Sequence, residues 1–342
     1  MSHFTHRQPG SAPARISLRQ GVISLIVAIA GTGALACTPE PRERLSIALM
    51  RTPVTGVVAI AQAEGLFAAE GLDVSVVDAA SGGEALAAAL EGRVDLAAVA
   101  GMPLLREVAA GRAPRVLAGV QHSTRLAGVV ARRDRGIARA SDLRSHSVGY
   151  APASTGEAFL RTLLMAEGMR WSDVRAEPMP LEELLAALAS GRLDAAALSC
   201  PQLERAARAL GPSRAVTLYT DMFVDRTMLV ARDEVVASRR SALLRALRAL
   251  VRTERLAREE PQRAFAALRR TLPGEDEAQL REQWARVVPQ LEISNALVHS
   301  LYSQAGLLYD RGQASPSSFR RLLVPQLLAA VDPEAVTVER AP

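Results

Sequence analysis

The strongest constraint on the fold of this chain is a regular alternation between short apolar segments and helical segments of about ten residues. The first strand is expected at 42–50, helical spacing follows at 57–63, and a second strand is expected at 72–77. The alternation continues with a helix at 83–91, a strand at 94–99, a helix at 104–110 and a strand at 115–120. Strands that alternate with helices predict a mostly parallel sheet covered on both faces.

The pattern then restarts, and one segment of the first half is repeated in the second. The expected strands are 129–131, 147–150, 174–177 and 194–198, and the expected helices are 157–167, 181–190 and 203–210. Residues 84–106 align without gaps on 183–205, with 11 of 23 positions identical. The repeat favours two similar lobes that face each other; convergence on one helix–turn–strand solution is the alternative. From Val235 onward the sequence predicts mainly helices with solvated charged faces.

The first 37 residues have the order of a secretory signal. A polar segment with three arginines and no acid precedes Gly21–Ala36, an uncharged apolar run of 16 residues. This run is shorter than the roughly 20 residues that a membrane-spanning helix needs. Its end, Ala34-Leu35-Ala36-Cys37, resembles the lipobox of bacterial lipoproteins, which implies a signal peptide at 1–36, lipidation of Cys37 and a linker at 37–43. An ordinary signal peptide with a coincidental cysteine, and an uncleaved anchor, are the alternatives.

Charge and composition exclude several classes of function. All 41 basic residues are arginine, and the chain has 36 acids and a net charge of +5. Three of the arginines and none of the acids precede Cys37, so the remainder carries only +2. This small excess and the 12 aromatic residues argue against a nucleic-acid interface. Two cysteines, Cys37 and Cys200, are too few for a disulfide scaffold or a cysteine-rich metal site, and we expect neither a metal nor a cofactor.

Common catalytic motifs are also absent from the sequence. It contains no Gly-x-Ser-x-Gly elbow, no His-Glu-x-x-His and no Gly-x-x-x-x-Gly-Lys loop. We therefore expect a protein that is not an enzyme.

An ordered series of motifs resembles one family, the ABC-transporter solute-binding proteins for nitrate, sulfonates, taurine and thiamine pyrimidine precursors. The series begins with AEGLFAAEGLDV at 63–74 and continues through the motifs at 81–86, 91–97, 141–143, 154–156 and 191–196. Related pyrimidine-precursor synthases share this fold and consume a lysine-bound pyridoxal phosphate. A chain without lysine cannot form that Schiff base, and the cysteine-rich iron motif of those enzymes is missing as well.

The resemblance implies a type II periplasmic-binding-protein fold, α/β and bilobed, with two mixed, mostly parallel sheets and a ligand cleft between the lobes. Lobe I would comprise 44–122, lobe II 123–222, and 223–342 would return to lobe I and add C-terminal helices, with hinges near 121–124 and 220–224. The protein would be a periplasmic, lipid-anchored monomer. It would capture a small polar or anionic molecule and deliver it to ABC permease subunits. A sensor lipoprotein with the same clamp, or an enzyme on the same scaffold, are the alternatives.

In open parallel sheets, ligands bind beyond the carboxyl ends of the strands. Asp95 and Asp194 precede their strands, so we interpret both as turn and capping residues. The candidate ligand-binding residues instead follow strands or begin helices. They are Arg51, Thr52, Ser81, Gly82, Gly101, Met102, His122, Ser154, Thr155, Gly156 and Ser199.

Several of these candidates also have a purely structural interpretation. Ser81-x-x-Glu84 and Ser154-x-x-Glu157 are capping boxes, although the free N–H groups of such helix ends can bind polar or anionic groups. Arg51 could form two parallel hydrogen bonds with a carboxylate, sulfonate or phosphate, or it could simply be an exposed arginine. His122 is a packing or hinge residue in the structural interpretation, and Cys200 is expected to pack as a small buried thiol.

Overall fold

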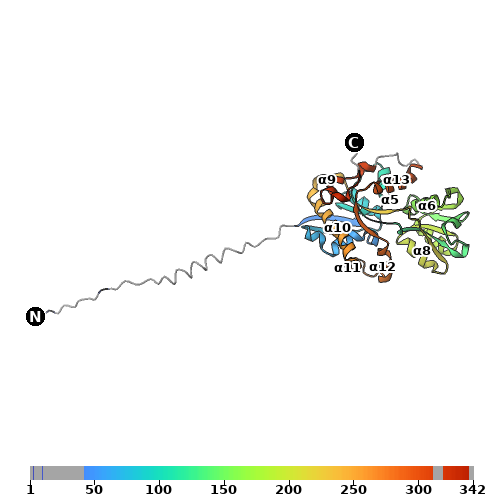
Figure 1. Cartoon of the computed structure of the whole chain (residues 1–342), viewed down its shortest axis with the longest axis horizontal. Helices are drawn as coiled ribbons and strands as arrows, with labels where there is room; N and C mark the ends of the chain where they lie inside the picture. The colour runs from blue at the N-terminus through green and yellow to red at the C-terminus, as the bar shows by residue number, and fades with distance from the viewer. Residues whose placement is uncertain (1–2, 4–9, 11–41, 311–318, 339–342) are drawn as a thin grey trace. The chain divides into compact units, whose positions relative to one another are not determined.

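The alternating strands and helices build two sheets, each covered by helices (Figure 1). The computed structural model describes residues 3, 10, 42–310 and 319–338. Both sheets belong to one compact unit that begins at Arg42. Each sheet contains parallel and antiparallel neighbours, which confirms the predicted bilobed α/β fold with two mixed sheets. Parallel pairs are not the majority as expected, because three of the five strand pairs in sheet A and two of the four in sheet B are antiparallel. The signal sequence and Cys37 lie outside the described residues, so those two predictions stay predictions.

Sheet A forms lobe I and has the strand order β11-β4-β10-β3-β1-β2. Its strands are β1 (Glu43–Leu49), β2 (Leu72–Asp78), β3 (Leu96–Val99), β4 (Arg115–Ser123), β10 (Asp225–Ala231) and β11 (Val288–Glu292). β1 runs parallel to β2 and β3, whereas β10 runs antiparallel to β3 and β4. The helices between these strands are α2 (Gly56–Ala63), α3 (Leu66–Ala69), α4 (Gly82–Leu90) and α5 (Gly101–Ala109).

Sheet B forms lobe II and has the strand order β7-β6-β8-β5-β9. Its strands are β5 (Ala127–Arg132), β6 (Ser147–Tyr150), β7 (Arg175–Pro178), β8 (Ala195–Ser199) and β9 (Ala215–Leu218). Its helices are α6 (Thr155–Ala166), α7 (Leu181–Ser190) and α8 (Gln202–Leu210). Read in the opposite direction, sheet A has the order β2-β1-β3-β10-β4, followed by the additional edge strand β11. These five strands correspond in turn to β7-β6-β8-β5-β9 of sheet B, so β10 has the position that β5 has in lobe II. The internal repeat therefore corresponds to two lobes of the same topology.

Two segments connect the lobes. The first, 124–126, joins β4 of sheet A to β5 of sheet B, and the second, 219–224, joins β9 of sheet B to β10 of sheet A. Phe223 of the second segment is buried and packs edge-on against Phe159 of α6, with ring centroids 5.5 Å apart. An edge-to-face aromatic pair of this kind fixes the direction in which the chain leaves lobe II.

The C-terminal part of the chain returns to lobe I, where orange and red helices surround sheet A in Figure 1. They are α9 (Asp233–Ser238), α10 (Arg240–Glu259), α11 (Pro261–Thr271), α12 (Glu277–Ala285), α13 (Asn295–Asp310) and α14 (Pro325–Ala329). The helical prediction from Val235 onward is correct except for β11, which pairs with β4 at the sheet edge.

The antiparallel strands β5 and β10 lie inside their sheets, and every residue of both is buried. A strand covered on both faces is expected to be a continuous apolar run. β5 (AGVVAR) conforms up to its last residue, but β10 (DRTMLVA) begins with three polar side chains, Asp225, Arg226 and Thr227. These buried polar residues lie where the chain re-enters lobe I after the second connecting segment. Their hydrogen-bond partners are described below because Asp225 lines a cavity.

Candidate ligand-binding cleft

Two adjoining cavities lie where the lobes meet. The inner cavity has a volume of about 230 Å³ and the outer cavity about 380 Å³. Residues after β1, β2 and β3 of lobe I line the inner cavity, together with the end of β8 and the first residues of α6 and α8 from lobe II. Met50, Val54, Ala80, Leu126, Cys200 and Gln202 line both cavities. The site is thus at the carboxyl ends of the parallel strands of both sheets, where ligands of open α/β sheets bind.

Six of the residues expected to bind a ligand line these cavities. The inner cavity is lined by Ser81, Gly82, Thr155 and Ser199, and the outer cavity by Arg51 and Thr52. The fold therefore brings together candidate residues that are up to 148 positions apart in the sequence. All six were selected because they lie near the carboxyl ends of strands.

The remaining five candidates lie elsewhere. Gly101 begins α5, where a Cβ would come within 2.5 Å of the Gln304 amide, and Met102 is buried in the core of lobe I. Gly156 lies against the backbone of β8, since a Cβ there would come within 2.5 Å of the Ala197 carbonyl oxygen. These two glycines permit close packing between elements. The residues that line the two cavities do not include any of these three.

His122 and Ser154 are likewise not among the residues that line the two cavities, and the His122 Nδ1 has no hydrogen-bond partner within the described residues. His122 lies opposite Arg226 in the β4–β10 pair, and burial followed by the Arg226 charge lowers its pKa. The Ser154 hydroxyl accepts from the Glu157 N–H at 3.2 Å and donates to the Ala151 carbonyl at 2.6 Å. Ser154 thus forms the capping box that its spacing predicts.

Ser81 forms the equivalent box in lobe I while lining the inner cavity. Its hydroxyl accepts from the Glu84 N–H at 3.1 Å, and the Glu84 carboxylate accepts from the Ala80 N–H at 2.8 Å. Arg51 is likewise occupied, because its Nε lies 2.5 Å from the Asp78 carboxylate at the end of β2. Both side chains of this pair are well exposed, so the pair links two strand ends without being withdrawn from solvent.

Among the lining residues of the inner cavity that were not predicted from the sequence, Asp225 is the acidic one. Its side chain lines the cavity, the residue is 7% exposed, and its Oδ1 has no hydrogen-bond partner. Burial raises the pKa of the Asp225 carboxyl from 3.8 to about 7, against the opposing effect of the Arg226 backbone N–H. The available signal was an acid three residues before the apolar run Met228–Ala231 of β10, a strand that was not predicted from the sequence.

Cys200 lines both cavities as a neutral thiol. Burial, followed by the charge of Glu204, raises the pKa of the Cys200 thiol to about 12. Because the thiolate is the nucleophilic form, a thiol with such a high pKa is unreactive near neutral pH. Cys200 is therefore part of the cavity wall, as its expected packing role implies.

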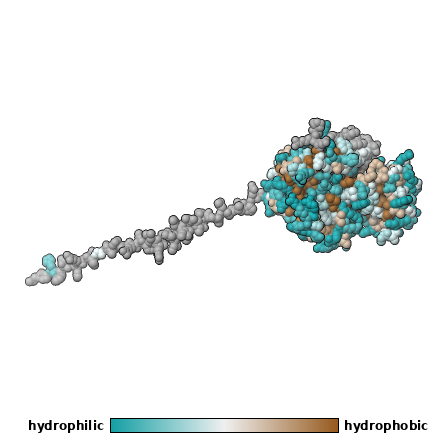
Figure 2. All heavy atoms as spheres, in the orientation of Figure 1, coloured by the Kyte–Doolittle hydropathy of each residue, from teal (hydrophilic) through white to brown (hydrophobic). Residues whose placement is uncertain are grey.

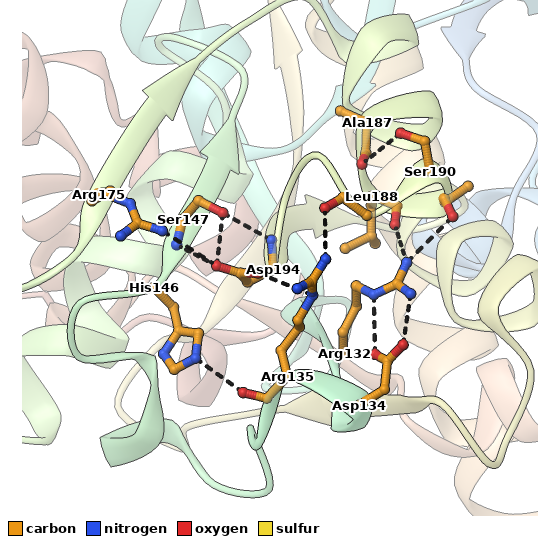
Figure 3. A network of polar contacts seen from close by, with 12 residues as sticks. Arg132, Asp134, Arg135, His146, Ser147, Arg175, Ala187, Leu188, Ser190 and Asp194 are labelled. Carbon is orange, nitrogen blue, oxygen red and sulfur yellow. Dashed lines mark hydrogen bonds and ion pairs between the residues drawn. The ribbon is translucent and has the colours of Figure 1, made fainter.

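The repeated aspartates lie at the opposite edge of the sheets. Figure 3 shows Asp194 in lobe II, whose Oδ2 accepts from the backbone N–H and the hydroxyl of Ser147, both at 2.9 Å. Asp95 in lobe I accepts in the same way from Ser46, both at 2.8 Å. Burial would raise the pKa of Asp194, but the hydrogen bonds from Ser147 outweigh it and lower that pKa. Both aspartates are structural links between neighbouring parallel strands, as their position before the strands predicts.

Two further features of the described residues bear on function. No helix in the described part of the chain is both long and apolar enough to cross a membrane. No cluster of three or more His, Cys, Asp or Glu side chains in the same residues could hold a metal ion. The visible face of the folded part carries mostly hydrophilic side chains with scattered apolar spots (Figure 2).

The fold and the cleft define the class of bilobed, type II periplasmic-binding-protein structures. One solved example is the periplasmic aliphatic sulphonate binding protein SsuA of Escherichia coli, with a TM-score of 0.68, 18% identity and coverage of 84% of this chain and 99% of that one. The desulfurization enzyme DSZB has the same fold, with a TM-score of 0.57, 17% identity and coverage of 86% and 99%. At these identities the likeness concerns the fold alone.

Within this class, the chain belongs to the NMT1/THI5 like family, whose model matches residues 52–264. This result confirms the family resemblance inferred from the motifs. A relative named "Putative binding protein BAB2_1146", from Brucella abortus, is 27% identical over 214 residues, which cover 61% of this chain. The match spans 65% of the length of that relative.

Proposed function

We propose that this protein is an extracytoplasmic solute-binding lipoprotein that captures a small polar or anionic organic molecule and delivers it to an ABC importer. The observation that carries the proposal is the cleft itself, whose walls come from strand ends and helix starts of both lobes. A ligand in such a cleft contacts both lobes only when they are close together. Binding therefore shifts the equilibrium of the clamp toward the closed state.

Two observations, one on the cleft and one on the sequence, support binding of a ligand without its chemical conversion. Cys200, the cysteine within the described residues, has a thiol whose pKa is about 12, so it is a poor nucleophile. The chain has no lysine for a Schiff base. A sensor lipoprotein that uses the same clamp is the second candidate, and permease and ATPase genes beside this gene would favour transport over sensing.

A thermal-shift screen tests the proposed function. The compounds are sulfonates, carboxylates, nitrate, pyrimidines and flavins, each also incubated with the protein and recovered after denaturation. We expect one class to raise the Tm by about 5 °C at 100 times its Kd and to be recovered unchanged. Chemical conversion of the bound compound would point to an enzyme, and the absence of any binder would contradict the proposal.

The proposed lipid anchor has a separate test, since it depends on a residue outside the described part of the chain. If Cys37 is lipidated after removal of residues 1–36, the protein should be found in the membrane fraction. Cys37→Ser should release it into the soluble fraction, as measured by fractionation and by metabolic labelling with a fatty acid. Continued membrane association of the unlabelled variant would favour an uncleaved N-terminal anchor.

A further inference from the structure

The strongest unexplained feature of the cleft is the unpartnered carboxyl of Asp225. Asp225 is the first residue of β10, directly after the second connection between the lobes, and lies opposite Ser123 of β4. It lines the inner cavity although only 7% of the residue is exposed. Its Oδ1 has no partner within the described residues. A buried carboxyl oxygen without a partner is costly, so a ligand is a reasonable source of the missing donor.

The neighbouring arginine cannot supply that donor. Side chains alternate between the two faces of a strand, so Arg226 points to the face of sheet A opposite Asp225. There Arg226 Nη1 lies 2.5 Å from the Glu292 carboxylate, in a pair of which both side chains are about 10% exposed. Thr227 shares the face of Asp225, but its hydroxyl donates to the Val54 carbonyl at 2.6 Å. Thr227 thus has another partner, and Arg226, whose Nε has no partner within the described residues, is excluded by its position on the reverse face.

The other walls of the inner cavity do not compensate the carboxyl either. Of the described residues that line it, Asp225 and Cys200 are the ionisable ones, and Cys200 is a neutral thiol. The rest of the lining is small, apolar or uncharged, for example Val54, Ala98 and Leu126. Arginines occur further out, where Arg51, Arg205 and Arg208 line the outer cavity. Glu275 also lines the outer cavity, and Arg51 is paired with Asp78. The inner cavity therefore has one acid, Asp225, whereas the outer cavity has mixed charge with more arginines than acids.

We propose that Asp225 determines ligand specificity, and that the inner cavity selects small molecules which present a cationic N–H group, of the amidine or amine type, to its carboxylate. This inference rests on the proposed ligand-binding function and narrows its ligand class. A cationic nitrogen supplies both the missing donor and the missing charge, which makes its hydrogen bond to a buried carboxylate strong. An anionic group in the same place would require Asp225 to be protonated. Any anionic part of the ligand would lie toward the arginines of the outer cavity.

Binding of a cationic group should depend on pH through Asp225. The charged groups around it are already paired or neutral: Arg226 with Glu292 on the reverse face, and Arg125 with Asp221 at 3.0 Å in the connecting segments. His122, also on the reverse face, has a pKa lowered by burial, and Cys200 faces the cavity as a thiol. A cation should bind about 30-fold more tightly at pH 8 than at pH 5.5, because the pKa of Asp225 is about 7 before binding.

Two series of matched probes test the inference. Acetamidine, acetamide and acetate have nearly the same shape but carry charges of +1, 0 and −1, and benzamidine, benzamide and benzoate form a larger series. Amidines stay cationic from pH 5.5 to 8, so the probe itself does not titrate. We expect an amidine to bind at least tenfold more tightly than its amide and carboxylate partners at pH 8, measured by calorimetry and thermal shift.

Variants then assign the effect to Asp225. Asp225→Asn should abolish the pH dependence and weaken amidine binding at pH 8 at least tenfold. The control is Asp73→Asn, since Asp73 lies on β2 of the same lobe, is exposed and is not among the residues that line the two cavities. If either variant fails to fold, the pH dependence of the unmodified protein still decides the matter, because cationic and anionic probes predict slopes of opposite sign.

The possible results separate this inference from the proposed function. Tight binding of nitrate, a sulfonate or a carboxylate, unchanged by Asp225→Asn and with no binding of either amidine, would overturn the inference but leave a solute-binding protein. Failure of every probe, in a protein that also binds nothing in the broader screen, would overturn both. Amidine binding that Asp225→Asn leaves intact would overturn the role of Asp225 alone.

Discussion

At the scale of single residues, most buried charges in the described part of the chain are paired, whereas the Asp225 carboxyl is not. Arg226 and Glu292 neutralise each other, and Asp194 receives hydrogen bonds from Ser147 that lower its pKa. Asp225 has neither kind of compensation, and burial raises its pKa to about 7. An uncompensated buried acid destabilises the protein without ligand and gains most from a ligand that supplies a cation. Asp225 therefore lowers the stability of the protein without ligand and raises its affinity for a cationic ligand.

Asp225→Asn should change the pH dependence of stability in a defined direction. The folded-state pKa of about 7 exceeds the ordinary value of 3.8, so the folded protein binds more protons than the unfolded chain between these pH values. Stability from this group is therefore present below about pH 4 and is lost as the pH rises to about 7. The lost free energy of unfolding is up to about 4 kcal/mol. The free energy gained by the variant should therefore grow between pH 5 and pH 8, as measured by urea unfolding.

Asp73→Asn serves as the control for this measurement too, because it changes an exposed aspartate of the same lobe. The unfolding free energy of Asp73→Asn should follow that of the unmodified protein at every pH, since Asp73 alternates outward between the buried residues Leu72 and Val74 of β2. Parallel curves for Asp225→Asn and the unmodified protein would show that the Asp225 carboxyl titrates near its ordinary value, and would remove the energetic reason for a cationic partner.

At the scale of secondary structure elements, the two lobes use the same device to fix neighbouring parallel strands. Asp95 binds Ser46 across β3 and β1, and Asp194 binds Ser147 across β8 and β6, through the same backbone and hydroxyl donors. Each of these aspartates is the last residue of the repeated Gly-Arg-apolar-Asp motif. The glycines that begin the motif, Gly92 and Gly191, have positive φ angles of 80° and 82°. The repeat in the sequence is therefore a repeat of local structure at the edge away from the cleft.

The same local logic explains how much of the fold could be predicted from the sequence. Periodicity located the strands and helices up to residue 210, and the carboxyl-edge rule selected Ser81, Thr155 and Ser199, which line the inner cavity. β10 was missed because its first residues are polar, and β11 because Pro289 and Glu292 do not resemble a strand. Strand pairing across more than 100 residues decides both cases, and a local pattern does not contain that information.

Three site candidates do not line the cavities, for a related reason. Gly101, Met102 and Gly156 follow strands as the rule requires, but each belongs to the first turn of a helix and faces the protein interior. The edge rule selects a position along the chain and leaves the direction of the side chain open. That direction depends on packing against distant elements such as α13, which carries Gln304. Tertiary contacts therefore decide which residues of each turn reach the ligand.

At the scale of the whole molecule, direct contacts bridge the two lobes beside the cleft. Glu204 on α8 of lobe II accepts hydrogen bonds from Gln279, at 3.1 Å, and Gln283, both on α12. Arg286, which follows α12, lies 3.6 Å from the same carboxylate and 3.4 Å from the Tyr219 hydroxyl in the second connecting segment. α12 packs against α11 and therefore belongs to lobe I. The Glu204 carboxylate is the centre of an interlobe contact that favours the closed arrangement.

Glu204→Ala should weaken that arrangement and with it the affinity for ligand. Hydrogen bonds to a charged group are worth about 1.5–3 kcal/mol, and the loss of this amount shifts the population toward open forms. Because the apparent Kd rises as the binding-competent fraction falls, we expect the best binder of the thermal-shift screen to lose about 10- to 150-fold in affinity. Small-angle scattering without ligand should give a larger radius of gyration.

Glu167→Ala, which changes an exposed acid of the same lobe, should alter neither the affinity nor the radius of gyration. Unchanged scattering and affinity in Glu204→Ala would mean that the connecting segments alone hold the lobes together.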